Sequence, residues 1–365
     1  MSLELSALIS ENIAFSFYEI SMMSRNCNQN FKATILEIQR MSTEDGPGLR
    51  TTAFFKGCSL NCKWCHNPES ISAQPQVHWI GNRCIGCKIC LEVCPQNALA
   101  FTPEGNTVDR PKCNGCGICA DECPSTALEL LGQSWNLEDL YAEVIKDKTY
   151  FEKSDGGVTL GGGEPLLQSD FCRSLLRRLK ENAIHTAVDT CGLCSRKALD
   201  RILPHTDLVL YDLKEINPQK HELFTGSDNH NILENLVYIR EFMQSEGKPE
   251  ALWIRTPVIP GATASDENIR AIGQFMADNL DGFVSRWDLC AFNNLCRDKY
   301  LRLDWEWEFK DSDLLSKLFM EKMAAIARNS GINPDIVHWS GSTRLDVNDI
   351  SNEHAVSVKD TITRI

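Results

Sequence analysis

The chain has 365 residues and a formal net charge of −13, with 42% hydrophobic and 24% charged residues. This is globular composition, and the length suits one large domain with a smaller one. The negative charge disfavours nucleic acid, whose binding proteins usually carry a basic face. No run approaches the roughly 18 apolar residues of a membrane helix, and residues 1–30 carry no secretion signal. We therefore expect a cytoplasmic protein with no membrane partner.

Residues 1–30 mix polar and apolar side chains without a motif. We predict an extension that is disordered or that precedes a true start at Met22 or Met23, and we assign it no function. The predicted organisation is an extension over 1–30, a main domain over 31–78 and 132–341, an insert over 79–131 and a tail over 342–365.

From residue 31, apolar runs alternate with helical patterns. The expected strands are 32–39, 49–55, 158–160, 185–189, 207–212, 251–258 and 287–292. The expected helices are 137–150, 166–182, 195–203, 231–245, 265–278 and 311–329. Alternation of this kind predicts a parallel sheet with right-handed crossovers. Six strand–helix units are too few for a closed eightfold barrel, so we predict an α/β fold with an open, partial (β/α)6 barrel. Its functional residues should lie at the carboxyl ends of the strands.

Cysteine is abundant, with 17 residues, of which eleven fall between Cys58 and Cys123. Disulfide frameworks of this density belong to short, secreted, loop-rich chains. In a reducing compartment, thiols so closely spaced are more typical of metal or iron–sulfur ligands.

The first cysteine cluster follows the expected strand 49–55 and has the spacing C-x3-C-x2-C, with ligands Cys58, Cys62 and Cys65. Three thiolates can hold three irons of a [4Fe–4S] cluster and leave the fourth iron free for a substrate. The alternatives are a structural zinc site or a cluster with a distant fourth cysteine.

Other strand ends are rich in glycine or charge. The turn Gly161–Pro165 reads Gly-Gly-Gly-Glu-Pro, and glycine lets backbone approach a ligand closely. Asp189-Thr190 and Asp212-Leu213-Lys214 end the next two strands, and Arg255 lies on the following one. An isolated Asp at such a place is often only a turn or helix cap. Two acidic strand ends with a nearby Lys favour a polar ligand instead.

The cysteine loop and the glycine-rich turn resemble the radical S-adenosylmethionine superfamily. The closest resemblance is to glycyl-radical-enzyme activating enzymes, such as the pyruvate formate-lyase activase, and covers about residues 33–330. It is supported by the segments 44–50, 65–68 and 254–261. This resemblance implies that the open iron chelates the methionine group of S-adenosylmethionine. One electron then breaks the S–C5′ bond, and the 5′-deoxyadenosyl radical takes a hydrogen atom from a backbone glycine of a partner enzyme.

The resemblance also implies the cofactor contacts. Asp189 and Thr190 would help to hold a monovalent cation. At Asn293 the family's Pro-Tyr-His stretch is replaced by Ala-Phe-Asn, so this side chain can hydrogen-bond but cannot titrate. The implied contacts are Trp64, Cys65, His66, Gly162, Gly163, Glu164, Asp189, Thr190, Asp212, Leu213, Lys214, Arg255 and Asn293.

The insert contains two runs with the spacing C-x2-C-x2-C-x3-C-P, which is the pattern of bacterial ferredoxins with two clusters. In that pattern the fourth cysteine binds the other cluster. We therefore predict a ferredoxin-like α+β domain in which the clusters relay electrons or have a structural role. One predicted cluster has ligands Cys84, Cys87, Cys90 and Cys123, and the other has ligands Cys113, Cys116, Cys119 and Cys94.

The remaining cysteines have no ligand spacing, and we interpret the pair Cys191 and Cys194 as incidental. These cysteines are Cys27, Cys172, Cys191, Cys194, Cys290 and Cys296.

The sequence thus predicts three [4Fe–4S] clusters, S-adenosylmethionine as cofactor, and a monomer supplied with electrons by flavodoxin or ferredoxin in an anaerobic cell. The protein substrate would be a glycyl radical enzyme, with a fumarate-adding synthase favoured weakly. Two alternatives are a radical enzyme that modifies a small molecule or peptide, and a non-catalytic electron carrier.

Overall fold

The computed structural model describes residues 31–280 and 282–344. The predicted extension over 1–30, with Cys27, and most of the predicted tail lie outside this range. Within it, no helix is long and apolar enough to cross a membrane. All sixteen cysteines of the described part are free.

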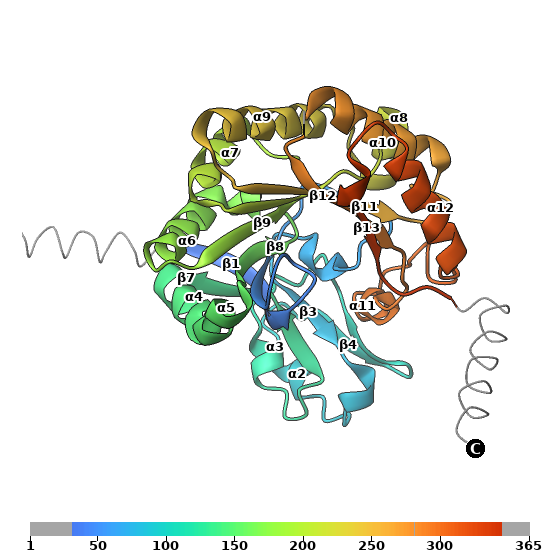
Figure 1. Cartoon of the computed structure of the whole chain (residues 1–365). Coiled ribbons are helices and arrows are strands. Elements are labelled where there is room, and N and C mark those ends of the chain that lie inside the picture. Colours follow the sequence, from blue (N-terminus) through green and yellow to red (C-terminus); the bar gives the residue numbers. More distant parts are fainter. Residues whose placement is uncertain (1–30, 281, 345–365) are drawn as a thin grey trace, which may run out of the picture.

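The core is one nine-stranded, mostly parallel sheet (Figure 1). Its order is β13-β12-β11-β10-β9-β8-β2-β1-β7, with β13 and β7 at the edges. The seven strands from β13 to β2 run parallel, whereas β1 is antiparallel to both neighbours. The α/β class with a parallel sheet is therefore confirmed. The bounds are β1 (Lys32–Ser42), β2 (Arg50–Phe55), β7 (Gln133–Asn136), β8 (Gly157–Gly162), β9 (His185–Thr190), β10 (Leu208–Asp212), β11 (Ala251–Val258), β12 (Val284–Ala291) and β13 (Val337–Ser340).

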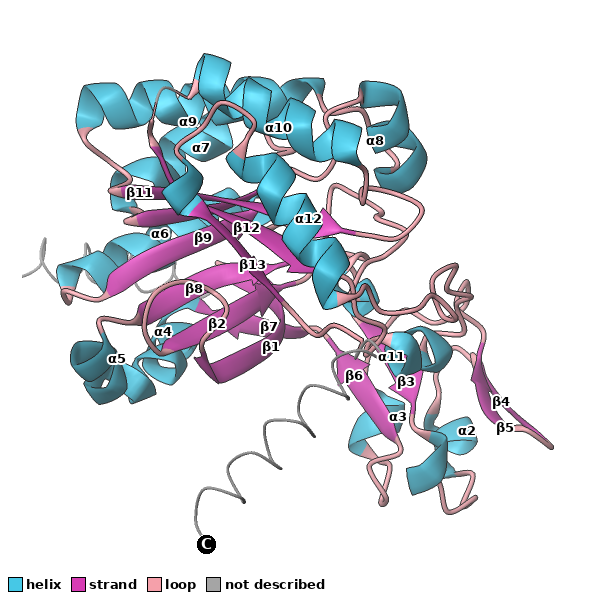
Figure 2. Cartoon of the chain, turned by 45° about the vertical axis from the view of Figure 1, so that its right-hand side comes forward, coloured by secondary structure: helices cyan, strands magenta, loops and turns pink. Residues whose placement is uncertain are grey.

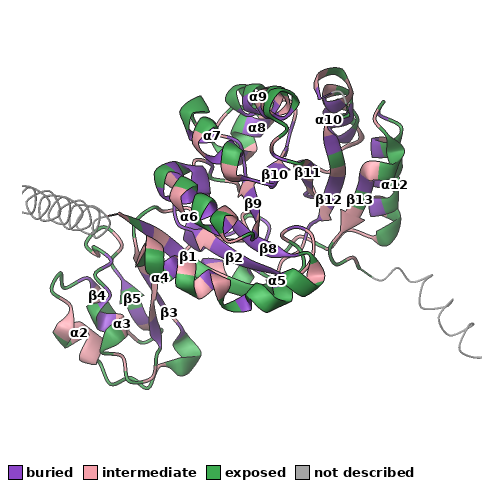
Figure 3. Cartoon of the chain, turned by 60° about the vertical axis from the view of Figure 1, so that its left-hand side comes forward, coloured by how far each residue is buried: buried purple, intermediate pink, exposed green. Residues whose placement is uncertain are grey.

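Helices cover the outer face of the sheet, and their buried sides face the strands (Figure 3). Several start where a side-chain oxygen caps the first turn, as Ser195, Ser265 and Ser316 do for α7, α10 and α12. The bounds are α4 (Leu137–Val144), α5 (Lys148–Ser154), α6 (Ser169–Glu181), α7 (Arg196–Ile202), α8 (Pro218–Thr225), α9 (His230–Glu246), α10 (Asp266–Asn279), α11 (Arg297–Arg302) and α12 (Lys317–Arg328).

Several elements differ from the sequence prediction, which did not include the short helices α8 and α11. The expected helix 137–150 is two helices separated by the 3-10 turn Ile145–Asp147. Asp147 is buried there and accepts a 2.8 Å hydrogen bond from Thr51, which ties the turn to β2. The parallel strand β13 and the edge strand β7 were missed, because each has only four residues and includes polar side chains. The sheet therefore has seven parallel strands instead of six.

The insert lies to one side of the sheet and contains two small two-stranded antiparallel sheets and two short helices (Figure 2). It contacts the main domain through Lys56, which donates to Gln76, and Arg110, which donates to the carbonyl of Arg302. Its sheet begins at Gln76, just before the predicted boundary. The bounds are β3 (Gln76–Trp79), β4 (Leu99–Thr102), β5 (Gly105–Val108), β6 (Leu128–Leu131), α2 (Ile89–Val93) and α3 (Ile118–Asp121).

Asp207, just before β10, stabilises the amino-terminal end of the sheet. Its side chain is 3% exposed and accepts hydrogen bonds from Lys180 at 2.7 Å, Lys248 at 3.1 Å and the Thr186 amide at 2.9 Å. Burial opposes the charged form, but these donors outweigh it and lower the pKa of Asp207 to about 2. A lowered pKa contributes stability above the unfolded value of about 4, and this contribution is lost as the pH falls toward 2.

We therefore expect Asp207→Asn to lower the free energy of unfolding by about 2 kcal/mol at pH 7. The difference from the parent protein should shrink as the pH falls below 4, measured by urea unfolding. Glu241→Gln, which removes an exposed carboxylate, is the control and should change stability little. A difference for Asp207→Asn that is constant from pH 7 to pH 3 would contradict this account.

Candidate active site

The cysteine loop follows β2 and is held by backbone hydrogen bonds. The amides of Gly57 and Cys58 donate to the carbonyls of Ser70 and Ile71, at 2.7 and 3.0 Å. Farther along, the Asn61 amide donates to the carbonyl of Thr225 at the end of α8. The loop is therefore fixed by two separate segments before any ligand is bound.

A cluster of aromatic rings supports the same loop from the C-terminal part of the chain. Trp64 is buried among them, and Tyr300 donates to the carbonyl of Cys65 at 2.9 Å. Trp307 donates to the carbonyl of Lys63 at 3.0 Å and stacks on Tyr300 with ring centroids 5.1 Å apart. The sequence prediction did not include Tyr300 and Trp307, because they lie far from every motif.

One cavity of about 270 Å³ at the carboxyl ends of the strands gathers most of the predicted site. Cys58, Cys62 and Cys65 line one part of it, and residues from β8 to β12 line the rest. Three cysteines that face a single cavity are a donor set suited to an iron–sulfur cluster. The other predicted contacts in the lining are Trp64, His66, Gly162, Gly163, Asp189, Asp212, Lys214 and Arg255.

Burial makes the thiolate forms of these cysteines costly in the unliganded protein. It raises the pKa of Cys62 to about 11 and that of Cys65 to about 12, although Lys214 partly offsets the effect. Metal binding deprotonates a coordinating thiol. Loading iron on this loop should therefore release protons.

The glycine-rich turn packs directly against the cysteine loop. The Gly163 amide donates to the Phe55 carbonyl at 2.9 Å, and the next amide, of Glu164, donates to the Gly57 carbonyl at 2.7 Å. A Cβ atom on Gly163 would lie 2.1 Å from that Gly57 carbonyl oxygen. No side chain fits at position 163 unless the cysteine loop moves.

Glu164 and Thr190 occupy a different place from the other predicted contacts. The Glu164 carboxylate is fully buried and accepts hydrogen bonds from the Thr190 hydroxyl at 2.8 and 2.9 Å and from the Cys191 amide at 2.9 Å. Burial raises its pKa well above the usual range. These two side chains join β9 to the glycine-rich turn behind the cavity, so they support the site and do not line it. Thr190 therefore points away from the cavity that Asp189 lines.

A charged network crosses the cavity between three neighbouring strands. Arg255 on β11 contacts Asp189 at 2.5 Å and Asp212 at 3.2 Å, and Lys214 contacts Asp212 at 2.6 Å. Burial raises the pKa of Asp189 to about 6 despite the neighbouring Arg255. For Asp212, the attraction of Lys214 and Arg255 outweighs burial and lowers the pKa. Two cations and two carboxylates give a site that can bind a zwitterionic ligand.

Two predicted contacts, Leu213 and Asn293, are not among the residues that line the cavity. Leu213 is buried, and its amide donates to the Arg255 carbonyl at 2.9 Å. The carbonyl of Asn293 lies 3.1 Å from His66 Nε2, while its side chain accepts a hydrogen bond from the Leu295 amide.

The cavity also includes residues that sequence reasoning did not assign to the site. Cys191, Cys290 and Phe292 line it at the ends of β9 and β12. Each stands at the carboxyl end of an expected strand, so position alone could have indicated them.

Comparison with known proteins agrees with this geometry. Residues 52–271 match the family described as the radical SAM superfamily. The chain is 36% identical over 305 residues to the (2S)-3-sulfopropanediol dehydratase activating enzyme of Klebsiella oxytoca, covering 82% of this chain and 94% of the relative. It is 36% identical to the trans-4-hydroxy-L-proline dehydratase activating enzyme of Clostridioides difficile, over 83% of this chain and 98% of the relative.

A third relative, the choline trimethylamine-lyase activating enzyme of Oleidesulfovibrio alaskensis, is 35% identical over 81% of this chain and 95% of its own length. The chain belongs to the glycyl radical enzyme activating enzymes of the radical SAM superfamily. A [4Fe–4S] cluster and S-adenosylmethionine are therefore its cofactors, and the Cys58 loop with its cavity suits both.

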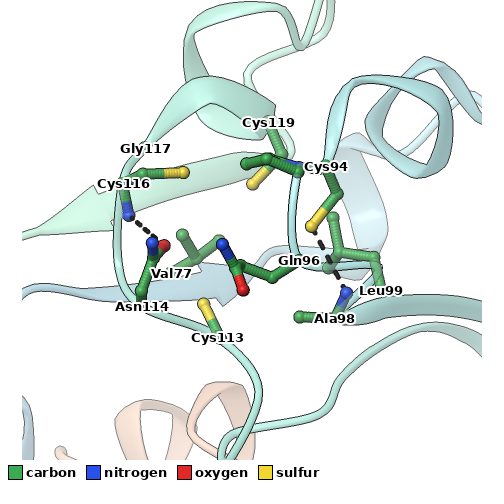
Figure 4. A pocket seen from close by; sticks show the side chains of 11 residues that line it. Val77, Cys94, Gln96, Ala98, Leu99, Cys113, Asn114, Cys116, Gly117 and Cys119 are labelled. Carbon is green, nitrogen blue, oxygen red and sulfur yellow. Dashed lines mark hydrogen bonds between the residues drawn. The ribbon is translucent and has the colours of Figure 1, made fainter.

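The insert of this activating enzyme has two further small cavities that are lined by cysteines. Each brings together three cysteines of one run and the last cysteine of the other. The sulfur atoms of the first cavity face a common space (Figure 4). Four thiols around each cavity are a complete ligand set for a [4Fe–4S] cluster. The cysteines are Cys94, Cys113, Cys116 and Cys119 in the first cavity and Cys84, Cys87, Cys90 and Cys123 in the second.

Proposed function

We propose that Cys58, Cys62 and Cys65 hold a [4Fe–4S] cluster with one open iron, and that this chain installs a radical on a glycine of a partner enzyme. The observation that carries the proposal is the single cavity in which these three cysteines face Gly163 and the charged network. A cluster held by these three cysteines would supply the one electron that cleaves S-adenosylmethionine into methionine and a 5′-deoxyadenosyl radical.

The protein groups bind and orient the substrate around that chemistry. We assign Gly162 and Gly163 to the methionine amino group, because only glycine allows the backbone to approach this closely. We assign the cationic Arg255 and Lys214 to the methionine carboxylate, and Asp212, which contacts both, to holding them in position. For a monovalent cation, Asp189 offers Oδ2, the carboxylate oxygen that does not contact Arg255. No side chain has to act as an acid or base.

The partner is a glycyl radical enzyme in this proposal. The relatives are named for a sulfopropanediol dehydratase, a hydroxyproline dehydratase and a choline lyase. Enzymes of these kinds are candidate partners beside the fumarate-adding synthase that the sequence analysis favoured.

The test is incubation of the reduced, anaerobic enzyme with S-adenosylmethionine and one purified candidate partner at a time. A glycine-centred doublet in the EPR spectrum of the partner, with one methionine and one 5′-deoxyadenosine formed per radical, is the expected result. Formation of 5′-deoxyadenosine with a peptide or small molecule, but with no candidate partner, would favour the alternative substrate class.

We further propose that the insert is a ferredoxin-like domain in which two [4Fe–4S] clusters relay electrons from flavodoxin or ferredoxin to the Cys58 loop. Each cavity has a full set of four thiols, so neither leaves an iron free for substrate. Because Cys87 and Cys116 are exposed, an electron donor can come close to both cavities.

The double variant Cys87→Ser, Cys116→Ser tests the relay. We expect 5′-deoxyadenosine formation by this variant to fall to background with reduced flavodoxin, but to persist with a small chemical reductant. Cys172→Ser, which changes a thiol on α6, is the control for loss of a cysteine. Parent-like rates with flavodoxin would show that the insert clusters have a structural role.

A further inference from the structure

The two cavities of the insert are built from equivalent sequence positions. Cys84 and Cys113 differ by 29 in residue number, and so do the other paired cysteines of the two runs. All eleven residues that line the first cavity have a counterpart, displaced by the same 29 residues, that lines the second. A paired position at which the residue types differ therefore marks a chemical difference between two otherwise equivalent sites.

The cavities lie at different distances from the main domain. Along the β3–β6 ladder, Gln76 pairs with Leu131 at the end that joins the main domain, and Trp79 pairs with Leu128 at the far end. The first cavity is lined by Val77, and its Gly115 turn packs against the backbone of Pro75. The second is lined by residues from the far end of the ladder. We call the Cys94, Cys113, Cys116 and Cys119 cavity proximal, and the Cys84, Cys87, Cys90 and Cys123 cavity distal.

The paired strand position that faces the thiols is Val77 in the proximal cavity and Asn106 in the distal one. Val77 is 1% exposed and Asn106 is 6% exposed, so both are shielded from water. Asn106 Nδ2 lies 3.0 Å from the sulfur of Cys90. Val77 has no polar group to offer in the equivalent place.

The orientation of the Asn106 amide follows from chemistry. A thiolate sulfur only accepts hydrogen bonds, so the NH2 group and not the carbonyl oxygen must face it. The oxygen, Oδ1, is buried and has no hydrogen-bond partner within the described ranges. Leaving a buried carbonyl unpaired costs about 1–3 kcal/mol. That cost is explained if the Asn106 amide is held in place to donate a hydrogen bond to the Cys90 sulfur.

A hydrogen bond to a cluster sulfur stabilises the more negative, reduced form of an iron–sulfur cluster, which raises its reduction potential.

We propose that Asn106 sets the distal [4Fe–4S] cluster at a higher reduction potential than the proximal one. This inference depends on the proposal above that both cavities hold clusters. An electron from a reduced flavodoxin or ferredoxin oxidises that donor by one electron and reduces one cluster from the 2+ to the 1+ state. At equilibrium this electron resides on the distal cluster, far from the main domain, and passes inward only when the Cys58 site consumes it.

The test is a redox titration of the full, anaerobically reconstituted chain, followed by EPR, in which the two sites are exchanged at one paired position. Asn106→Val should lower the reduction potential of the higher-potential insert cluster by ~59 mV, which corresponds to a tenfold change in its one-electron equilibrium constant. Val77→Asn should raise the reduction potential of the lower-potential cluster by a similar amount. The double exchange should therefore reverse their order.

Iron and sulfide analysis separates the possible failures. If the parent chain binds no more iron than the Cys58 loop requires, the proposed insert clusters are wrong. If every variant holds its clusters and the titration curves superimpose on those of the parent, the role of Asn106 is wrong. If Asn106→Val loses iron, the test depends on Val77→Asn alone, because this variant adds a hydrogen-bond donor without removing one. An unchanged reduction potential of the cluster in Val77→Asn would then overturn the proposal.

Discussion

Cys62→Ala should lower the rate of 5′-deoxyadenosine formation by more than about a thousandfold, equivalent to ~4 kcal/mol of activation free energy. The reason is that Cys62 and its two partner cysteines line the cavity together. Among the described residues, they are the cavity's set of thiols that can bind three irons of one cluster. Cys58→Ala and Cys65→Ala should behave alike, because removing any one thiol leaves a second iron without a protein ligand. The measurement is product formation by chromatography, with iron counted in the same sample.

Two other cysteines are matched controls. Cys172 is a buried thiol on α6 outside the cavity, and Cys172→Ala should retain both iron and activity. Cys191 lines the same cavity as Cys62, and its sulfur lies 3.6 Å from the Ser59 hydroxyl. Cys191→Ala should also keep the cluster. A loss as large as that of Cys62→Ala would make Cys191 a fourth ligand and would contradict the open iron.

Gly163→Ala is expected to give the second largest loss. Its Cβ would lie 2.1 Å from the Gly57 carbonyl oxygen, so the cysteine loop or the turn must shift by a large fraction of an ångström. A misplacement of about 1 Å in an active site can cost about a hundredfold in rate. We expect a loss of this size in kcat/KM for S-adenosylmethionine with iron content unchanged, because the three thiols themselves remain.

The control for this variant is Gly247→Ala. Gly247 ends α9 with a positive φ of 67° and has no atom within 4 Å of a new Cβ. It should lower stability by about 1 kcal/mol and leave catalysis unchanged. Parent-like kinetics for Gly163→Ala would mean that the glycine-rich turn does not approach the substrate.

Much of the fold could be predicted from the sequence because its periodicity is local. The strands β2, β8, β9, β10, β11 and β12 are apolar runs bounded by glycine or charge, and all six were predicted. The strand β13 was not, because its four residues gain their strand conformation from pairing with β12. A contact that is made only in the folded chain leaves no pattern in a short segment.

The candidate site, like the fold, was predicted only in part. The three cysteines were predicted from their spacing, and Gly163, Asp189, Asp212 and Arg255 were implied as contacts by the resemblance to the activating enzymes. The structure places all of them in one cavity. Glu164 and Thr190 lie behind it, because alternate residues of an extended chain point to opposite sides. Sequence patterns identify a strand end but do not reveal which side chain turns inward.

Tyr300 and Trp307 were missed for a different reason. They reach the carbonyls of Cys65 and Lys63 from a segment more than 200 positions away in sequence. Only the folded chain brings these rings to the cysteine loop, and no spacing rule connects them.

The proposed function requires that the cluster on the Cys58 loop has an iron open to S-adenosylmethionine. The most direct measurement is the EPR spectrum of the reduced enzyme before and after S-adenosylmethionine is added, with the spectrum of Cys62→Ala subtracted to remove the insert clusters. We predict that the signal of the Cys58 cluster changes shape on addition, and that methionine and 5′-deoxyadenosine then form in equal amounts. A full complement of iron on this loop with an unchanged signal and no products would contradict the claim.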